Sequence, residues 1–114
     1  GGFIQGMGWL TMEEVKWKSN GQLTTYSPST YKIPAVNDMP EKFYAKIFKQ
    51  GKNIENVVNK SKTTGEPPLM LAMSVFFAIK DAISSISNYK ISPELDAPAT
   101  AEKILLAINK ITEN

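Results

Sequence analysis

The longest apolar run in the chain begins at Pro67 and continues to Ile79, interrupted only by Ser74. A helix that is apolar all round is typical of one buried on every side. Beyond the middle of the run, apolar residues recur at helical spacing on one face, namely Val75, Ile79, Ile83 and Ile86. Because proline suits the first helical position, where a missing N–H costs nothing, the pattern predicts a helix that begins at Pro67.

Two other segments carry helical patterns. From Gly2 to Thr11 the chain is rich in glycine, and Gly2 and Gly6 are four residues apart, so on a helix they share one face and permit close backbone approach. This segment is predicted to be a helix or a turn. Thr100 is a good N-cap for a last helix, whose apolar face comprises Ile104, Leu105, Ile108 and Ile111.

Alternating polar and apolar residues predict strands. Residues 15–18 and 23–26 flank Asn20-Gly21, a pair typical of a hairpin turn, and residues 43–48 alternate as a third strand. Residues 54–58 fit either a strand or a helix, and residues 27–40, with three prolines, predict an ordered surface loop. The expected fold is therefore α+β, a small mixed or antiparallel sheet with packed helices.

Composition excludes several classes of function. The 114 residues suffice for one domain, and the net charge is only +2. All basic residues are lysines, which argues against a nucleic-acid partner, because base and phosphate recognition favours arginine. Without histidine or cysteine, the chain holds no catalytic triad, thiolate iron–sulfur site or usual zinc site. Trp9 and Trp17 are interpreted as packing residues.

Targeting and membrane signals are weak. The run from Pro67 to Ile79 is too short to cross a bilayer, and Lys80-Asp81 closes it, so we expect a core helix and no membrane partner. No charged segment followed by an apolar one opens the sequence, which predicts a cytoplasmic location.

The candidate chemistry centres on Glu66, which lies between Gly65 and Pro67-Pro68. A residue before proline is pushed into an extended conformation, so Glu66 is expected just outside the helix, near its positive end. Such a carboxylate could act as a base toward a molecule bound above the turn. It could equally satisfy the first amides of the helix, which is the commoner arrangement when the spacing alone is considered.

The chain contains the stretch Gly65-Glu66-Pro67-Pro68-Leu69, followed at 74–82 by Ser-Val-Phe-Phe-Ala-Ile-Lys-Asp-Ala. Together they resemble the C-terminal part of the molybdopterin-binding large subunit of bacterial-type xanthine dehydrogenases. Blocks at 2–14, 28–35 and 96–104 agree with this family in the same order, so the resemblance covers nearly the whole chain. It implies that residues 1–114 are the C-terminal portion of a molybdenum-cofactor-binding domain in a larger enzyme.

The resemblance also implies roles for individual residues. Glu66 would be the catalytic base that takes the proton of a hydroxyl on molybdenum, so that the oxygen attacks an sp² carbon of hypoxanthine or xanthine on the route to urate while a hydride passes to the metal's sulfido ligand. Gln5 would contact the pterin of the cofactor, and no residue of the chain would ligate the metal itself. The stretch that holds Lys62, Thr64 and Gly65 would also lie against the pterin, although Thr63-Thr64 replaces the family's usual Ala-Val.

The implied cofactor is molybdenum–molybdopterin, shared with the rest of the enzyme, with FAD, a 2Fe–2S cluster and NAD bound elsewhere. The implied partners are the remainder of the molybdenum subunit, an iron–sulfur/flavin subunit and a purine substrate. One alternative is an aldehyde or N-heterocycle oxidase of the same family, in which serine often follows the glutamate, so Pro67-Pro68 favours the purine branch. Another alternative is a free-standing, non-catalytic binding or scaffold domain.

Overall fold

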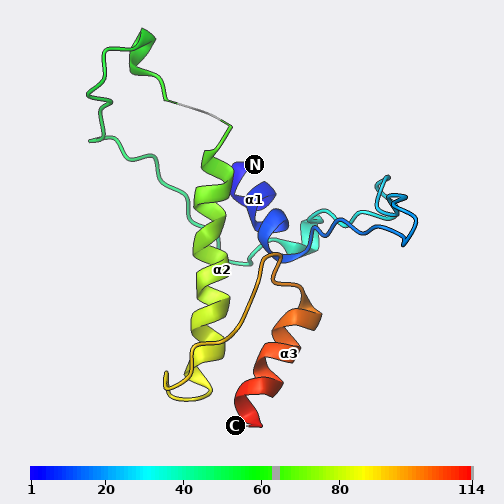
Figure 1. Ribbon diagram of the computed structural model, residues 1–114. Coiled ribbons are helices and arrows are strands. Elements are labelled where there is room, and N and C mark those ends of the chain that lie inside the picture. Colours follow the sequence, from blue (N-terminus) through cyan, green and yellow to red (C-terminus); the bar gives the residue numbers. More distant parts are fainter. Residues whose placement is uncertain (63–64, 114) are drawn as a thin grey trace.

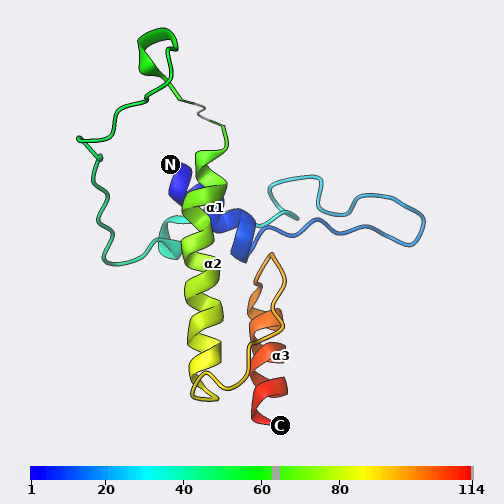
Figure 2. The same ribbon diagram turned by 60° about the vertical axis from the view of Figure 1, so that its left-hand side comes forward.

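The computed structural model describes residues 1–62 and 65–113. Its elements in chain order are α1 (Gly2–Thr11), η1 (Val36–Asp38), η2 (Val58–Lys60), α2 (Pro67–Ser85) and α3 (Ala101–Thr112), where η marks a short 3-10 turn. α1 lies against the N-terminal half of α2, and α3 runs beside its C-terminal half (Figures 1 and 2). The helices predicted near residues 2, 67 and 101 are therefore confirmed.

The predicted sheet is wrong, because the described residues contain no sheet at all. Around Gly21, whose φ is +81°, the chain does turn back on itself, and a single antiparallel bridge joins Trp17 to Leu23. The Lys18 N–H donates to the Gln22 carbonyl (2.8 Å). This turn and its flanking residues project from the helices as an arm (Figure 1), and Trp17, predicted to pack, is 62% exposed. A lone pair of strands is marginal in water, which explains why the arm goes no further than a turn.

Residues 43–48 form no strand either. Phe43 packs on Phe3 of α1, with 5.1 Å between ring centroids, but Tyr44, Ile47 and Phe48 are all exposed. A strand needs a neighbour for its backbone N–H and C=O groups, and no other described segment lies beside this one as a strand. Of the ambiguous residues 54–58, the last begins η2.

The buried core lies between the C-terminal half of α2 and α3. It consists of Ile83, Leu95, Ala99, Ala107 and Ile111, with Phe76, Ile79, Ile104 and Ile108 packed against it. Three of the four predicted apolar positions on α3 and two of the four on α2 belong to this core, whereas Leu105 and Ile86 are 58% and 45% exposed and lie outside it. The Thr100 hydroxyl accepts a hydrogen bond from the Lys103 N–H (3.4 Å), which confirms the predicted N-cap of α3.

The first half of α2 is not buried on every side, contrary to the prediction. Ala72 is fully buried, but most of the large apolar side chains of this half are exposed, namely Leu69, Met70, Leu71, Met73 and Phe77. By length and composition the 19-residue helix could cross a membrane, a test that core helices of soluble proteins also pass. Exposed apolar side chains gathered on one helix are typical of a surface that packs against another protein segment, a membrane or a ligand.

The loop of residues 27–40 is held against the C-terminal end of α1, as predicted for an ordered loop. The Tyr31 hydroxyl donates to Glu13 Oε2 (2.6 Å), and this bond raises the pKa of Tyr31 above its usual value. Glu14 pairs with Lys16 (3.1 Å) and with Lys103 of α3 (3.7 Å). The hydrogen bond from Lys16 is the main cause that lowers the pKa of Glu14. The end of α1 is thereby tied to both the loop and α3.

Candidate functional site

Glu66 is the N-cap residue of α2, and Pro67 is the first residue of the helix, as predicted. The backbone of Glu66 differs from the expectation, since φ −86° and ψ −28° are helical and not extended. The reason is local: the Glu66 carbonyl accepts the Leu69 N–H (3.0 Å), and this first turn of the helix requires helical angles at Glu66. The hydrogen bond outweighs the steric preference of a residue before proline.

The carboxylate of Glu66 does not cap the helix. It makes no hydrogen bond to the first turn, and it takes part in no ion pair that the described residues form. An N-cap side chain normally accepts the N–H of the second or third helical residue. Here the second is Pro68, which has no N–H, and the third is Leu69, whose N–H is bonded to the Glu66 carbonyl. The missing N–H of Pro68 and the bonded N–H of Leu69 together leave an exposed carboxylate that caps nothing.

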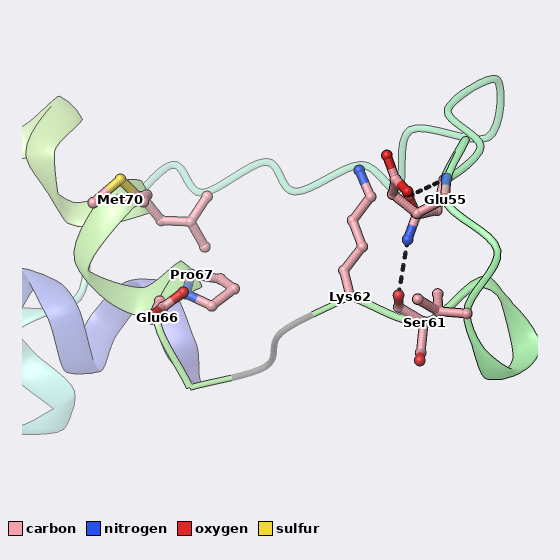
Figure 3. A pocket seen from close by; sticks show the side chains of 9 residues that line it. Glu55, Ser61, Lys62, Glu66, Pro67 and Met70 are labelled. Carbon is pink, nitrogen blue, oxygen red and sulfur yellow. Dashed lines mark hydrogen bonds between the residues drawn. The ribbon is translucent and has the colours of Figure 1, made fainter.

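Glu66 lines a pocket of about 830 Å³ that opens to the surface. One wall is the first turn of α2, and the other is the segment from Asn53 to Lys62 (Figure 3). The complete lining is Asn53, Glu55, Val57, Ser61, Lys62, Glu66, Pro67, Met70 and Leu71. Pockets of this size and mixed lining are typical of small-molecule and cofactor sites.

Two hydrogen bonds shape the wall opposite Glu66. Asn53 Nδ2 donates to the Ser61 carbonyl (2.9 Å), and the Glu55 N–H donates to Asn53 Oδ1 (3.1 Å). Figure 3 shows Glu55, Ser61 and Lys62 across the pocket from Glu66. Asn53 and Glu55 were not singled out from the sequence, because nothing in their spacing signals that this segment returns to the start of α2.

The structure brings some of the predicted site residues together. Lys62 and Glu66 line the same pocket, while Thr64 lies outside the described residues. Gly65 is exposed, and a Cβ there would meet no atom within 4 Å. Gln5 is exposed on α1 and is not among the pocket-lining residues.

Gln5 and Glu66 are nevertheless linked through the packing of their helices. Gly6, next to Gln5, is buried against α2, where a Cβ would collide with the Pro68 carbonyl oxygen and lie 2.7 Å from Ala72 Cβ. Gly2, one turn earlier, would place a Cβ 3.4 Å from Pro68 Cγ. The predicted close approach at this glycine face is confirmed, and it places α1 directly on the first turn of α2 (Figure 2).

Comparison with known proteins agrees with the resemblance. A family model described as a molybdopterin cofactor-binding domain matches residues 1–40. The xanthine dehydrogenase/oxidase of Mus musculus is 47% identical over 110 residues, which cover 91% of this chain and 8% of that protein. The xanthine dehydrogenase of Oryza sativa subsp. japonica is 44% identical over 125 residues (99% and 9%), and xanthine dehydrogenase 1 of Arabidopsis thaliana is 41% identical over 117 residues (94% and 8%). The chain thus spans less than a tenth of the length of these relatives.

Proposed function

Because the chain belongs to the xanthine dehydrogenase family, we propose that residues 1–114 are the C-terminal portion of a molybdenum-cofactor-binding domain and that Glu66 is the general base of a purine hydroxylase. The observation that carries this proposal is the Glu66 carboxylate, which lines the pocket and makes no capping hydrogen bond to α2. A carboxylate with no structural partner can take up a proton from a bound molecule, provided that molecule lies within hydrogen-bond reach.

The chemistry of two predicted site residues fits a pterin cofactor. The exposed amide of Gln5 has both donors and an acceptor, which suits the mixed hydrogen-bonding edge of a pterin. Lys62 adds a positive charge at the pocket that Glu66 lines.

In the proposed mechanism, the bound cofactor supplies the oxygen atom that the substrate gains and accepts the electrons that the substrate loses. Glu66 takes up the proton that is released as the oxygen becomes nucleophilic, and its place on the stiff first turn of α2 fixes the direction from which it does so. Gln5 orients the cofactor from α1. Such general-base assistance contributes about 10²–10⁴-fold to a rate.

Hypoxanthine and xanthine are the proposed substrates, on the route to urate. The names of the relatives and the Pro67-Pro68 pair support this choice over an aldehyde or N-heterocycle substrate. The proposal also includes FAD, a 2Fe–2S cluster and NAD in other parts of the enzyme, an iron–sulfur/flavin partner and a cytoplasmic location.

The exposed apolar side chains of α2 argue against the alternative of a free-standing scaffold domain. Leu69, Met70 and Leu71 are between 39% and 59% exposed, and two of them also line the pocket. A domain that functioned alone would not leave such a contiguous apolar surface in water. We assign this surface to contact with the remainder of the molybdenum domain, which would also complete the open pocket.

The proposal predicts different metal contents for the isolated chain and the full-length protein. The 114-residue chain is expected to retain no molybdenum and to oxidise no purine, because a pocket open to the surface and one exposed amide outside it cannot enclose a cofactor. The full-length protein is expected to retain molybdenum near one atom per chain. Metal analysis after gel filtration measures both, and stoichiometric molybdenum in the isolated chain would contradict the account.

Gln5→Ala in the full-length protein is expected to weaken cofactor retention more than it slows the reaction of each bound cofactor. The amide is assigned a hydrogen bond worth about 0.5–1.5 kcal/mol and no role in proton transfer. Molybdenum content and the rate per bound molybdenum separate the two effects. Gln50→Ala, at another exposed glutamine, is the matched control and should change neither. A full complement of molybdenum with a large loss of rate would refute the assignment.

A further inference from the structure

The helices α1 and α2 approach closely at Gly6, which is buried and has the Pro68 carbonyl oxygen and Ala72 Cβ where its own Cβ would lie. Pro68 follows Glu66 by two residues in the same turn, and Gly6 follows Gln5 immediately. Ala72 lies one helical turn beyond Pro68 on the same face of α2 and is fully buried. The contact therefore joins the two backbone segments that carry the proposed cofactor contact and the proposed base.

We propose that Gly6 is a positioning residue, which sets the distance between Gln5 and Glu66 by letting α1 rest directly on the first turn of α2. This inference rests on the proposed function of both residues. A displacement at this contact also moves the neighbouring residues of each helix, because backbone hydrogen bonds hold them together. Any side chain at residue 6 would separate the helices and move the base away from the bound cofactor.

The neighbouring glycine shows that the requirement is specific to residue 6. A Cβ on Gly2 would lie 3.4 Å from Pro68 Cγ, which is an ordinary van der Waals contact. A Cβ on Gly6 would instead collide with the carbonyl oxygen of Pro68, which is part of the backbone of α2. Both glycines lie in the same helix and face the same partner. Gly2→Ala, the same substitution in the same helix, is thus a control for Gly6→Ala.

The test uses the full-length protein. Gly6→Ala is expected to lower the rate of purine oxidation per bound molybdenum by about 10²-fold, the effect of misplacing a reacting group by roughly 1 Å. Molybdenum content should stay near native, and the melting temperature should fall because the added methyl group overpacks a buried contact. A crystal structure of the variant should show a longer distance between Gly6 Cα and the Pro68 oxygen. Gly2→Ala should keep the native rate. A native rate in Gly6→Ala would overturn the inference.

A double-mutant cycle separates this inference from the proposed function. If Gly6 acts through Glu66, Gly6→Ala should add little to the loss caused by Glu66→Gln, because groups that act as a unit are not additive. Fully additive losses would overturn the positioning role alone, and a native rate in Glu66→Gln would overturn the proposed function. Where Gly6→Ala does not fold, Ala72→Ser, which adds one atom to the same contact from the α2 side, gives the same comparison.

Discussion

Glu66→Gln in the full-length protein is expected to lower purine turnover per bound molybdenum by about 10²–10⁴-fold. The amide keeps the shape of the side chain but cannot accept a proton. Folding offers no competing explanation, because the Glu66 side chain makes no capping hydrogen bond and joins no ion pair among the described residues. Turnover at saturating purine, metal content and melting temperature are the measurements, and the last two should stay native.

Glu55→Gln is the matched control for this prediction. Glu55 lines the same pocket from the opposite wall (Figure 3). Its substitution therefore removes one negative charge from this pocket and leaves the proposed base in place. An exposed charge is worth about 0.2–1 kcal/mol, so the control should remain within roughly fivefold of the native rate. Similar losses in both variants would show that the pocket needs negative charge in general and would refute a specific role for Glu66.

Ile83→Ala is expected to destabilise the chain by about 2–5 kcal/mol, the usual cost of truncating a large buried side chain. Ile83 is 3% exposed and packs in the cluster that holds α2 and α3 together. Urea unfolding of the 114-residue chain, followed by circular dichroism, measures the loss. Leu106→Ala on α3, where the side chain is 54% exposed, should cost much less. Equal losses in both variants would contradict the placement of the core.

The helices could be predicted from local sequence patterns, whereas the sheet and the burial of α2 depend on contacts between distant segments. Pro67 at the start of α2 and Thr100 at the start of α3 act within one turn, so their effects are visible in the sequence. The strand predicted over residues 43–48 requires a neighbouring strand, and the alternation of its side chains contains no information about whether one is present. The same limit explains why an apolar run predicted burial at Leu69 and Met70, which are 39% and 59% exposed among the residues that the structure describes.

Part of the candidate site could likewise be predicted from local sequence, and part depends on long-range contacts. The sequence shows that the second helical residue is a proline and offers no amide to the Glu66 side chain. It does not show that the Leu69 amide is bonded to the Glu66 carbonyl, so the free carboxylate emerged only from the structure. The opposite wall of the pocket cannot be deduced, because Asn53 and Glu55 reach it only through the return of the chain toward α2. Gln5 was predicted from the family resemblance, and its link to Glu66 through Gly6 emerged only from the packing of α1 on α2.

The most direct test of the central claim is the rate at which purine reduces the enzyme in the absence of an electron acceptor. Anaerobic rapid mixing with xanthine isolates the step in which Glu66 takes up the proton, free of later electron transfer and product release. With molybdenum content matched, the account predicts that Glu66→Gln is reduced about 10²–10⁴-fold more slowly than the native protein. Reduction of the variant at the native rate would remove Glu66 from the mechanism and contradict the account.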